Sequence, residues 1–184
     1  MRILKFINQQ LIKDTNMKHL YSSIYHNPGI SRAHLSKQTA LSKTTVSTLI
    51  DELIERNFIL DGGAGESGTT GRKPNQLYIR RNSHFVVVFN WYENRIYTHL
   101  VDIAGTSVFQ EACELKQGEA YVSASRNCFQ NSVLQHCAPD EILGICVVIA
   151  AMIDENHGEI YSTTISLPSM EGSQILDSLN EAFP

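Results

Sequence analysis

The strongest constraint on the fold is a run of apolar residues between positions 43 and 56 that is spaced like one face of a helix. The run consists of Val46, Leu49, Ile50, Leu53 and Ile54. Intervals of three and four residues place such side chains on one side of an α-helix. Ser42 stands immediately before the run, where a helix N-cap is expected. The spacing therefore predicts a helix over residues 43–56 with a single buried stripe.

The opposite face of this predicted helix carries small hydroxyl side chains and one cation near its start. Together with the cap residue, these are Ser42, Lys43, Thr44, Thr45, Ser47 and Thr48. Hydroxyl groups and lysine can reach phosphates and base edges when a helix enters the major groove, whereas acidic side chains would be repelled. An ordinary amphipathic helix with a Ser/Thr-rich surface is the alternative, but β-branched Thr is a poor helix former. The pattern favours a helix that reads DNA.

Two shorter helices are predicted before it. Met17, Leu20, Tyr21 and Ile24 form an apolar stripe within residues 15–25, which Asn27-Pro28-Gly29 ends. Ser31 is a cap candidate for a second helix, over residues 32–38, whose Leu35 can face inward. This short helix also carries Arg32 and Lys37, which we expect to contact DNA phosphates.

A β-hairpin is predicted after the three helices. Residues 58–61 and 77–79 read as its strands, and a glycine-rich segment that ends in Arg72, Lys73 and Pro74 lies between them. Gly63, Gly65 and Gly68 spell GxGxxG, but a strand follows where a dinucleotide-binding motif requires a helix. The hairpin therefore reads as a wing, and we expect Arg72 and Lys73 to reach a narrow minor groove.

The distribution of charge divides the chain in two. Residues 1–81 hold twelve Lys and Arg against six Asp and Glu, whereas residues 82–184 hold three against thirteen, within a net charge of −4. A basic half suggests a polyanionic partner. An unevenly charged solvated surface is the alternative reading. We expect a DNA-binding domain over residues 1–81 and a second domain over residues 82–184.

The second half reads as an α/β domain. Residues 85–90, 96–102 and 108–113 are predicted strands, followed by a helix from about 120 to 136 and a buried strand over 143–149. Ile175, Leu176, Leu179 and Phe183 indicate a last helix. The four cysteines, at 113, 128, 137 and 146, form no CxxC pair and no zinc-ligand spacing. We expect reduced core thiols and no metal site.

The N-terminal residues resemble a known family. Ser31-Arg-Ala-His-Leu-Ser-Lys, Leu41-Ser-Lys-Thr-Thr-Val-Ser-Thr-Leu-Ile-Asp-Glu-Leu and Gly71-Arg-Lys-Pro resemble the winged helix-turn-helix of the ROK family, which groups sugar-responsive repressors with sugar kinases. The resemblance covers about residues 14–81. It departs at Ala40, where the family usually has glycine in the turn, which implies some backbone strain or a slightly different turn, but not loss of the motif.

The second half resembles the start of the family's actin-like, RNase H-type domain. The resemblance implies an α+β protein in which a winged helix-turn-helix precedes a partial domain of that type. A kinase of this kind needs an Asp and glycines after its first strand to hold phosphates, and this chain has Asn90-Trp-Tyr-Glu-Asn there. The sequence ends at Pro184, before the family's sugar-contacting, catalytic and zinc-binding segments. We therefore expect no catalytic residue, no cofactor and no metal.

The residues and the resemblance together predict a DNA-binding transcriptional regulator, a repressor of carbohydrate-related genes. Its partners would be double-stranded operator DNA and a second copy in a homodimer. A sugar or sugar-phosphate effector would follow from the family, although the truncated domain argues against one. The sequence has neither a signal-peptide core nor a long apolar run, so we expect a cytoplasmic protein. The alternatives are a sugar kinase and an interaction protein that modulates a full-length relative.

Overall fold

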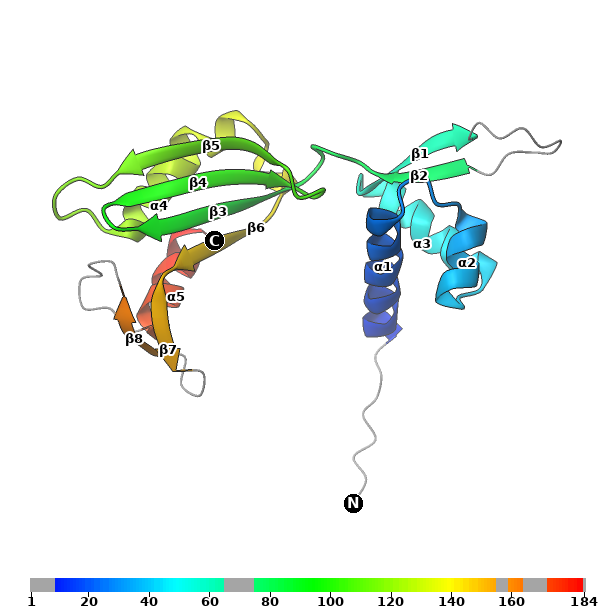
Figure 1. Ribbon diagram of the computed structural model, residues 1–184, viewed down its shortest axis with the longest axis horizontal. Helices are drawn as coiled ribbons and strands as arrows, with labels where there is room; N and C mark the ends of the chain where they lie inside the picture. The colour runs from blue at the N-terminus through cyan, green and yellow to red at the C-terminus, as the bar shows by residue number, and fades with distance from the viewer. Residues whose placement is uncertain (1–8, 65–74, 155–158, 164–171, 184) are drawn as a thin grey trace, which may run out of the picture. The chain divides into compact units, whose positions relative to one another are not determined.

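The computed structural model describes residues 9–64, 75–154, 159–163 and 172–183 (Figure 1). The chain divides into two compact units, residues 1–83 and 84–184. Each unit has its own buried cluster of apolar side chains.

Unit 1 contains three helices and a two-stranded hairpin. The helices are α1 (Gln9–His26), α2 (Arg32–Thr39) and α3 (Lys43–Glu55), and the strands are β1 (Ile59–Ala64) and β2 (Asn75–Ile79), which pair antiparallel. The three helices lie on one side of the hairpin (Figure 1). These elements confirm the predicted winged helix-turn-helix architecture, with α1 starting earlier than the sequence indicated.

The early start of α1 has a physical reason. Its first turns make no buried stripe, because Leu11 and Ile12 are exposed, so periodicity gives no signal there. Local hydrogen bonds support the helix in these turns. The Gln10 side-chain amide donates to the Asp14 carboxylate, four residues later, at 2.8 Å. The rest of α1 packs as predicted, with Leu20 and Ile24 fully buried.

The core of unit 1 joins all of its elements. The buried residues are Met17, Leu20, Ile24, Leu35, Val46, Leu49, Ile50, Leu53, Ile59 and Leu77. They include four of the five predicted stripe residues of α3, and Ile54 packs against the cluster while partly buried. The backbone of Leu77 in β2 also exchanges hydrogen bonds with Gly29 and Ile30, which ties the hairpin to the turn between α1 and α2.

Unit 2 is built on a four-stranded sheet of order β5-β4-β3-β6. Its strands are β3 (Phe85–Tyr92), β4 (Arg95–Asp102), β5 (Ser107–Glu114) and β6 (Ile142–Ile149), where the first three form an antiparallel meander and β6 is parallel to β3. The remaining elements are α4 (Tyr121–Asn131), the 3-10 turns Val133–Gln135 and Pro139–Glu141, the hairpin β7 (Ala151–Asp154) and β8 (Glu159–Thr163), and α5 (Gly172–Ala182).

Both helices of unit 2 contribute to one core on one face of the sheet. Alternate residues of β3, namely Phe85, Val87, Phe89 and Trp91, face this core and are buried. The Trp91 indole nitrogen donates to the Ser125 hydroxyl of α4 at 2.9 Å. Directly after α5, the Phe183 ring stacks on Phe89 with centroids 5.8 Å apart.

Two expectations about unit 2 are wrong. The run 143–149 is not a buried strand, because β6 alternates and exposes Leu143 and Val148. In the described part of the chain, β6 pairs with β3 alone and lies at the edge of its sheet. The cysteines are not all core thiols either: Cys128 is buried and Cys113 and Cys137 are half-buried, but Cys146 of β6 is exposed.

Candidate nucleic-acid interface

Both helices of the helix-turn-helix have an N-cap serine whose side chain accepts a backbone hydrogen bond. The Ser31 hydroxyl accepts the backbone N–H of His34 at 3.3 Å, and the Ser42 hydroxyl accepts that of Thr45 at 3.0 Å. Each cap satisfies one of the amide groups that a helix N-terminus leaves without an internal partner. Both predicted caps are therefore confirmed.

The turn between the two helices contains a residue in the left-handed backbone conformation and is bridged by one side-chain hydrogen bond. Ala40 ends α2 with φ 57° and ψ 14°, in the left-handed region. The Ser36 hydroxyl donates to the Leu41 carbonyl at 2.7 Å, just beyond this residue. The strain expected at Ala40 is thus present, and the turn keeps the form that brings α3 across α2.

The first turns of α3 present the predicted polar face. Ser42, Lys43, Thr44 and Thr48 are exposed, whereas Thr45 and Ser47 are half-buried. The hydroxyls of Ser42 and Thr45 lie 2.8 Å apart and hydrogen-bond to each other. Within the described residues, Lys43 and Thr44 have no side-chain partner, so these two groups are available to a ligand.

Arg32 is paired with groups of its own unit. Its Nη1 atom lies 2.7 Å from Asp51 Oδ1 and donates to the Ser47 carbonyl at 3.3 Å, while Nη2 lies 4.0 Å from Asp61 Oδ2. Its side chain is 28% exposed. The guanidinium thus joins α2, α3 and β1, and it offsets the charge of Asp51, which follows Ser47 and Thr48 by one helical turn.

A second ion pair offsets another acid of α3. Lys13 Nζ of α1 lies 2.7 Å from Glu52 Oε2, and Arg56 Nη1 lies 3.9 Å from Glu52 Oε1. Two of the three acids of this helix are therefore paired with cations. Sequence reasoning missed both Asp51 and Glu52 as partners, because Arg32 and Lys13 lie far from them along the chain and no local spacing signals the contact.

The remaining predicted cations lie on α2 and on the wing. Lys37 is exposed, and the structure gives it no acidic partner within the ranges it describes. Arg72 and Lys73 lie outside the described residues. The base of the wing is ordered by Asp61, whose carboxylate accepts the Gly63 amide at 3.1 Å and the Asn75 side chain at 2.9 Å.

The fold and this exposed helix face define a winged helix-turn-helix protein. A family model described as winged helix-turn-helix DNA-binding matches residues 13–59. The chain is also similar to a putative xylose repressor of Caldicellulosiruptor sp. strain Rt8B.4 (29% identical over 157 residues) and to a xylose repressor of Caldicellulosiruptor bescii (30% over 157 residues). A xylose repressor of Bacillus subtilis strain 168 is 26% identical over 161 residues.

These matches extend through most of this chain but not of its relatives. They cover 83%, 83% and 84% of this chain and 39%, 39% and 41% of the three repressors, respectively. The chain thus spans about two fifths of the length of the relatives it matches.

A solved structure shares the fold. It is the crystal structure of a ROK family transcriptional regulator, a homologue of the E. coli MLC protein. The TM-score is 0.68 at 17% identity, over 92% of this chain and 44% of that one. Together with the repressor relatives, this similarity confirms the resemblance to the ROK family's winged helix-turn-helix regulators. Among the described helices, none is both long and apolar enough to cross a membrane.

Proposed function

We propose that this protein is a sequence-specific DNA-binding transcriptional repressor of carbohydrate-related genes, with α3 inserted into the major groove. The observation that carries the proposal is the N-terminal face of α3, where exposed hydroxyls and Lys43 stand opposite a fully packed apolar stripe. The link to carbohydrate genes is supported by the relatives, which are named xylose repressors.

The proposal assigns a role to each predicted residue. The groove-reading face comprises Ser42, Lys43, Thr44, Thr45, Ser47 and Thr48. Lys37 contacts a phosphate, and Arg72 and Lys73 of the wing enter the minor groove. Arg32 contacts a phosphate with guanidinium donors that its Asp51 partner leaves available. Its second role in the proposal is to offset the charge of the Asp51 carboxylate near the DNA.

The turn that follows β3 supports a regulator over the alternative of a sugar kinase. Tyr92 pairs with Arg95, so only Glu93 and Asn94 connect β3 to β4. The Tyr121 hydroxyl donates to the Glu93 carbonyl and holds this turn against α4. A phosphate-binding loop needs open backbone N–H groups in a glycine-rich turn, and this short turn contains no glycine. We therefore assign no catalytic residue and no cofactor.

The proposed active form is a homodimer on two operator half-sites. Helix-turn-helix proteins read half-sites about one helical turn, or a multiple of it, apart, and two-fold symmetry matches such sites. Binding of a sugar or sugar-phosphate effector is a separate question. Adding xylose to the DNA-binding assay tests it. Sedimentation that shows a monomer at micromolar concentration, both free and on DNA, would contradict the dimer.

The test starts from a duplex selected by the protein out of a randomised pool. Binding of this duplex and of a scrambled one is measured by fluorescence anisotropy at several salt concentrations. Thr44→Ala should lose about 1–3 kcal/mol of preference at one base position if Thr44 contacts that base. Lys43→Ala should weaken binding to both duplexes and flatten the salt dependence.

Lys116→Ala is the matched control for Lys43→Ala, because it removes an equally exposed cation from the acidic unit. We expect it to bind both duplexes like the parent. If Lys43→Ala and Thr44→Ala also bind like the parent, α3 is not the reading helix. If no duplex is selected and the chain copurifies with a full-length relative, the interaction-protein alternative replaces the proposal.

A further inference from the structure

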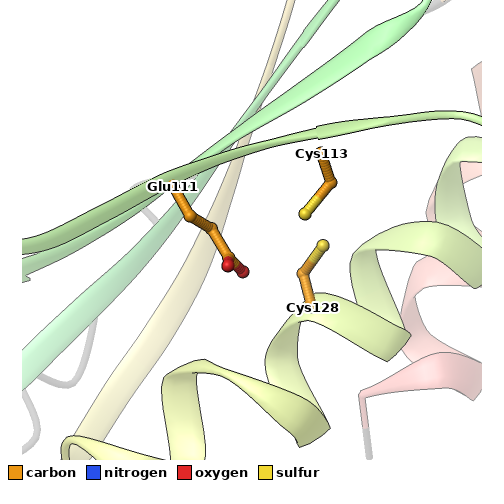
Figure 2. A group of neighbouring side chains, drawn as sticks. All are labelled: Glu111, Cys113 and Cys128. Carbon is orange, nitrogen blue, oxygen red and sulfur yellow. The ribbon is translucent and has the colours of Figure 1, made fainter.

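Three side chains that can ligate metal meet between the sheet and α4 in unit 2. Glu111 and Cys113 come from β5, and Cys128 comes from α4 (Figure 2). One ligand atom from each residue lies within 4.8 Å of the other two. Both sulfur atoms and the carboxylate point into the same space (Figure 2).

The pleat of β5 explains why Glu111 and Cys113 point inward. They are two residues apart and therefore lie on the same face, where they are less exposed than their neighbours. Across the ladder, Glu111 pairs with Thr98 and Cys113 with Ile96, both fully buried residues of β4. Cys128 approaches this face from α4 and is buried.

The carboxylate lacks the partner that its burial requires. Glu111 Oε1 is buried and has no hydrogen-bond partner in the described part of the chain. Buried carboxylate oxygens are normally paired or bound to a metal. An inward charge on an edge strand can also discourage strand pairing, but that role does not require two thiols beside the carboxylate.

We propose that Glu111, Cys113 and Cys128 form a binding site for a thiophilic divalent cation of the zinc class. Two thiolates and one carboxylate are ligands that Zn²⁺ accepts, and three protein ligands leave one position for water. Mg²⁺ and Ca²⁺ do not fit this donor set, since they select oxygen ligands. Both thiols lose their protons to solvent when the cation binds, so affinity rises with pH. The cation would join β5 to α4 and stabilise unit 2.

The test uses Co²⁺ as a spectroscopic probe on the full chain, reduced and freed of metal by a chelator. We expect one Co²⁺ per chain, with the absorption bands of thiolate–cobalt coordination, and displacement of the cobalt by Zn²⁺. Zinc at about 100 times its Kd should raise Tm by at least about 5 °C, because it binds the folded state.

Variants separate this site from the other cysteines. Cys113→Ala and Cys128→Ala should abolish the cobalt bands, and Glu111→Gln, which keeps the side-chain size, should weaken binding at least about tenfold. Cys146→Ser is the matched control, because it removes an exposed thiol outside the cluster and should leave binding unchanged. Circular dichroism shows whether each variant folds. If a cysteine variant does not fold, the Co²⁺ affinity of Glu111→Gln decides the test.

Three results would overturn the proposal. The parent chain could show no thiolate–cobalt bands, or the bands could persist in Cys113→Ala. A Cys113–Cys128 disulfide, found by mass spectrometry before reduction in a chain that takes up no Co²⁺ after reduction, would also exclude the site.

Discussion

At the scale of single residues, Ala40 occupies a conformation that suits glycine better than alanine. Its φ of 57° lies in the left-handed region, where a Cβ atom crowds the following carbonyl. Glycine removes this strain, although part of the gain is lost to the greater freedom of its unfolded chain. The turn form is therefore maintained by the Ser36–Leu41 hydrogen bond and the packing of Leu35 and Leu41 rather than by the backbone preference of alanine.

We predict that Ala40→Gly raises the free energy of unfolding of unit 1 by about 0.5–1 kcal/mol. Ala33→Gly is the control, because Ala33 is an exposed residue in the first turn of α2, where the backbone is right-handed. There the same substitution should lower stability by about 0.5–1 kcal/mol. Urea denaturation measures both. Equal losses in the two variants would contradict a strained turn.

The four thiols should differ widely in reactivity toward a thiol-modifying reagent in metal-free protein. Cys146 is exposed and should react first. Burial raises the pKa of Cys128 to about 12, with Cys113 as a further cause, so Cys128 is protonated at pH 8 and should react last. Burial also raises the pKa of Cys137. Mass spectrometry of time points gives the order, and early modification of Cys128 would show that the α4 layer opens readily.

At the scale of elements, Arg32 couples α2 to α3 and to the base of the wing. Its partner Asp51 is 65% exposed, so the pair should contribute only about 0.2–1 kcal/mol to stability. We expect its larger effect on DNA binding, because an unpaired Asp51 would stand one helical turn from Ser47 and Thr48 on the proposed reading face of α3. The arrangement thus places a supporting cation beside the proposed reading face.

A pair of variants tests this role of Arg32. Arg32→Ala should weaken binding to the selected duplex by roughly three- to tenfold, as expected for about 1 kcal/mol of charge repulsion. Asp51→Asn should restore most of that loss in the double variant Arg32→Ala/Asp51→Asn, measured by the same anisotropy assay. If the double variant binds as weakly as Arg32→Ala, the guanidinium itself contacts a phosphate.

At the scale of the whole molecule, unit 2 has a sheet with helices packed on one face and an apolar edge strand. Val147 of β6 faces the core, whereas its neighbour Val148 is 45% exposed. Leu143 on the same strand is 52% exposed. An exposed apolar edge strand is a site of self-association unless charge or cover protects it.

We predict that Val148→Lys reduces self-association, measured by light scattering, and changes stability by less than about 1 kcal/mol. Val147→Lys should instead unfold unit 2, because it buries an unpaired charge in the core. Thermal denaturation distinguishes the two variants. Equal destabilisation by both would mean that the exposed face of β6 is as tightly packed as its inner face.

Helices, caps and strands with local signals could be predicted from the order of the residues alone. These signals are the helical spacing around Leu49 and Ile50, the position of Ser42 before its helix, and the apolar run of residues 85–89, and all depend on residues a few positions apart. The resemblance to the ROK family also rests on such contiguous motifs. The early start of α1 was not predicted, because the apolar residues in its first turns are exposed and form no buried stripe.

Contacts between elements, in contrast, could not be predicted before the fold was known. Arg32 finds Asp51, Lys13 finds Glu52, and Cys113 meets Cys128, and these partners are set by helix packing and strand register rather than by spacing. Strand β6 is a further example. Its apolar run is typical of a strand in the middle of a sheet, but β6 lies at the edge of its sheet and its alternate residues are exposed. The physical reason is that burial and charge pairing depend on which residues are neighbours in space. Residues far apart in the sequence become neighbours only when the chain folds.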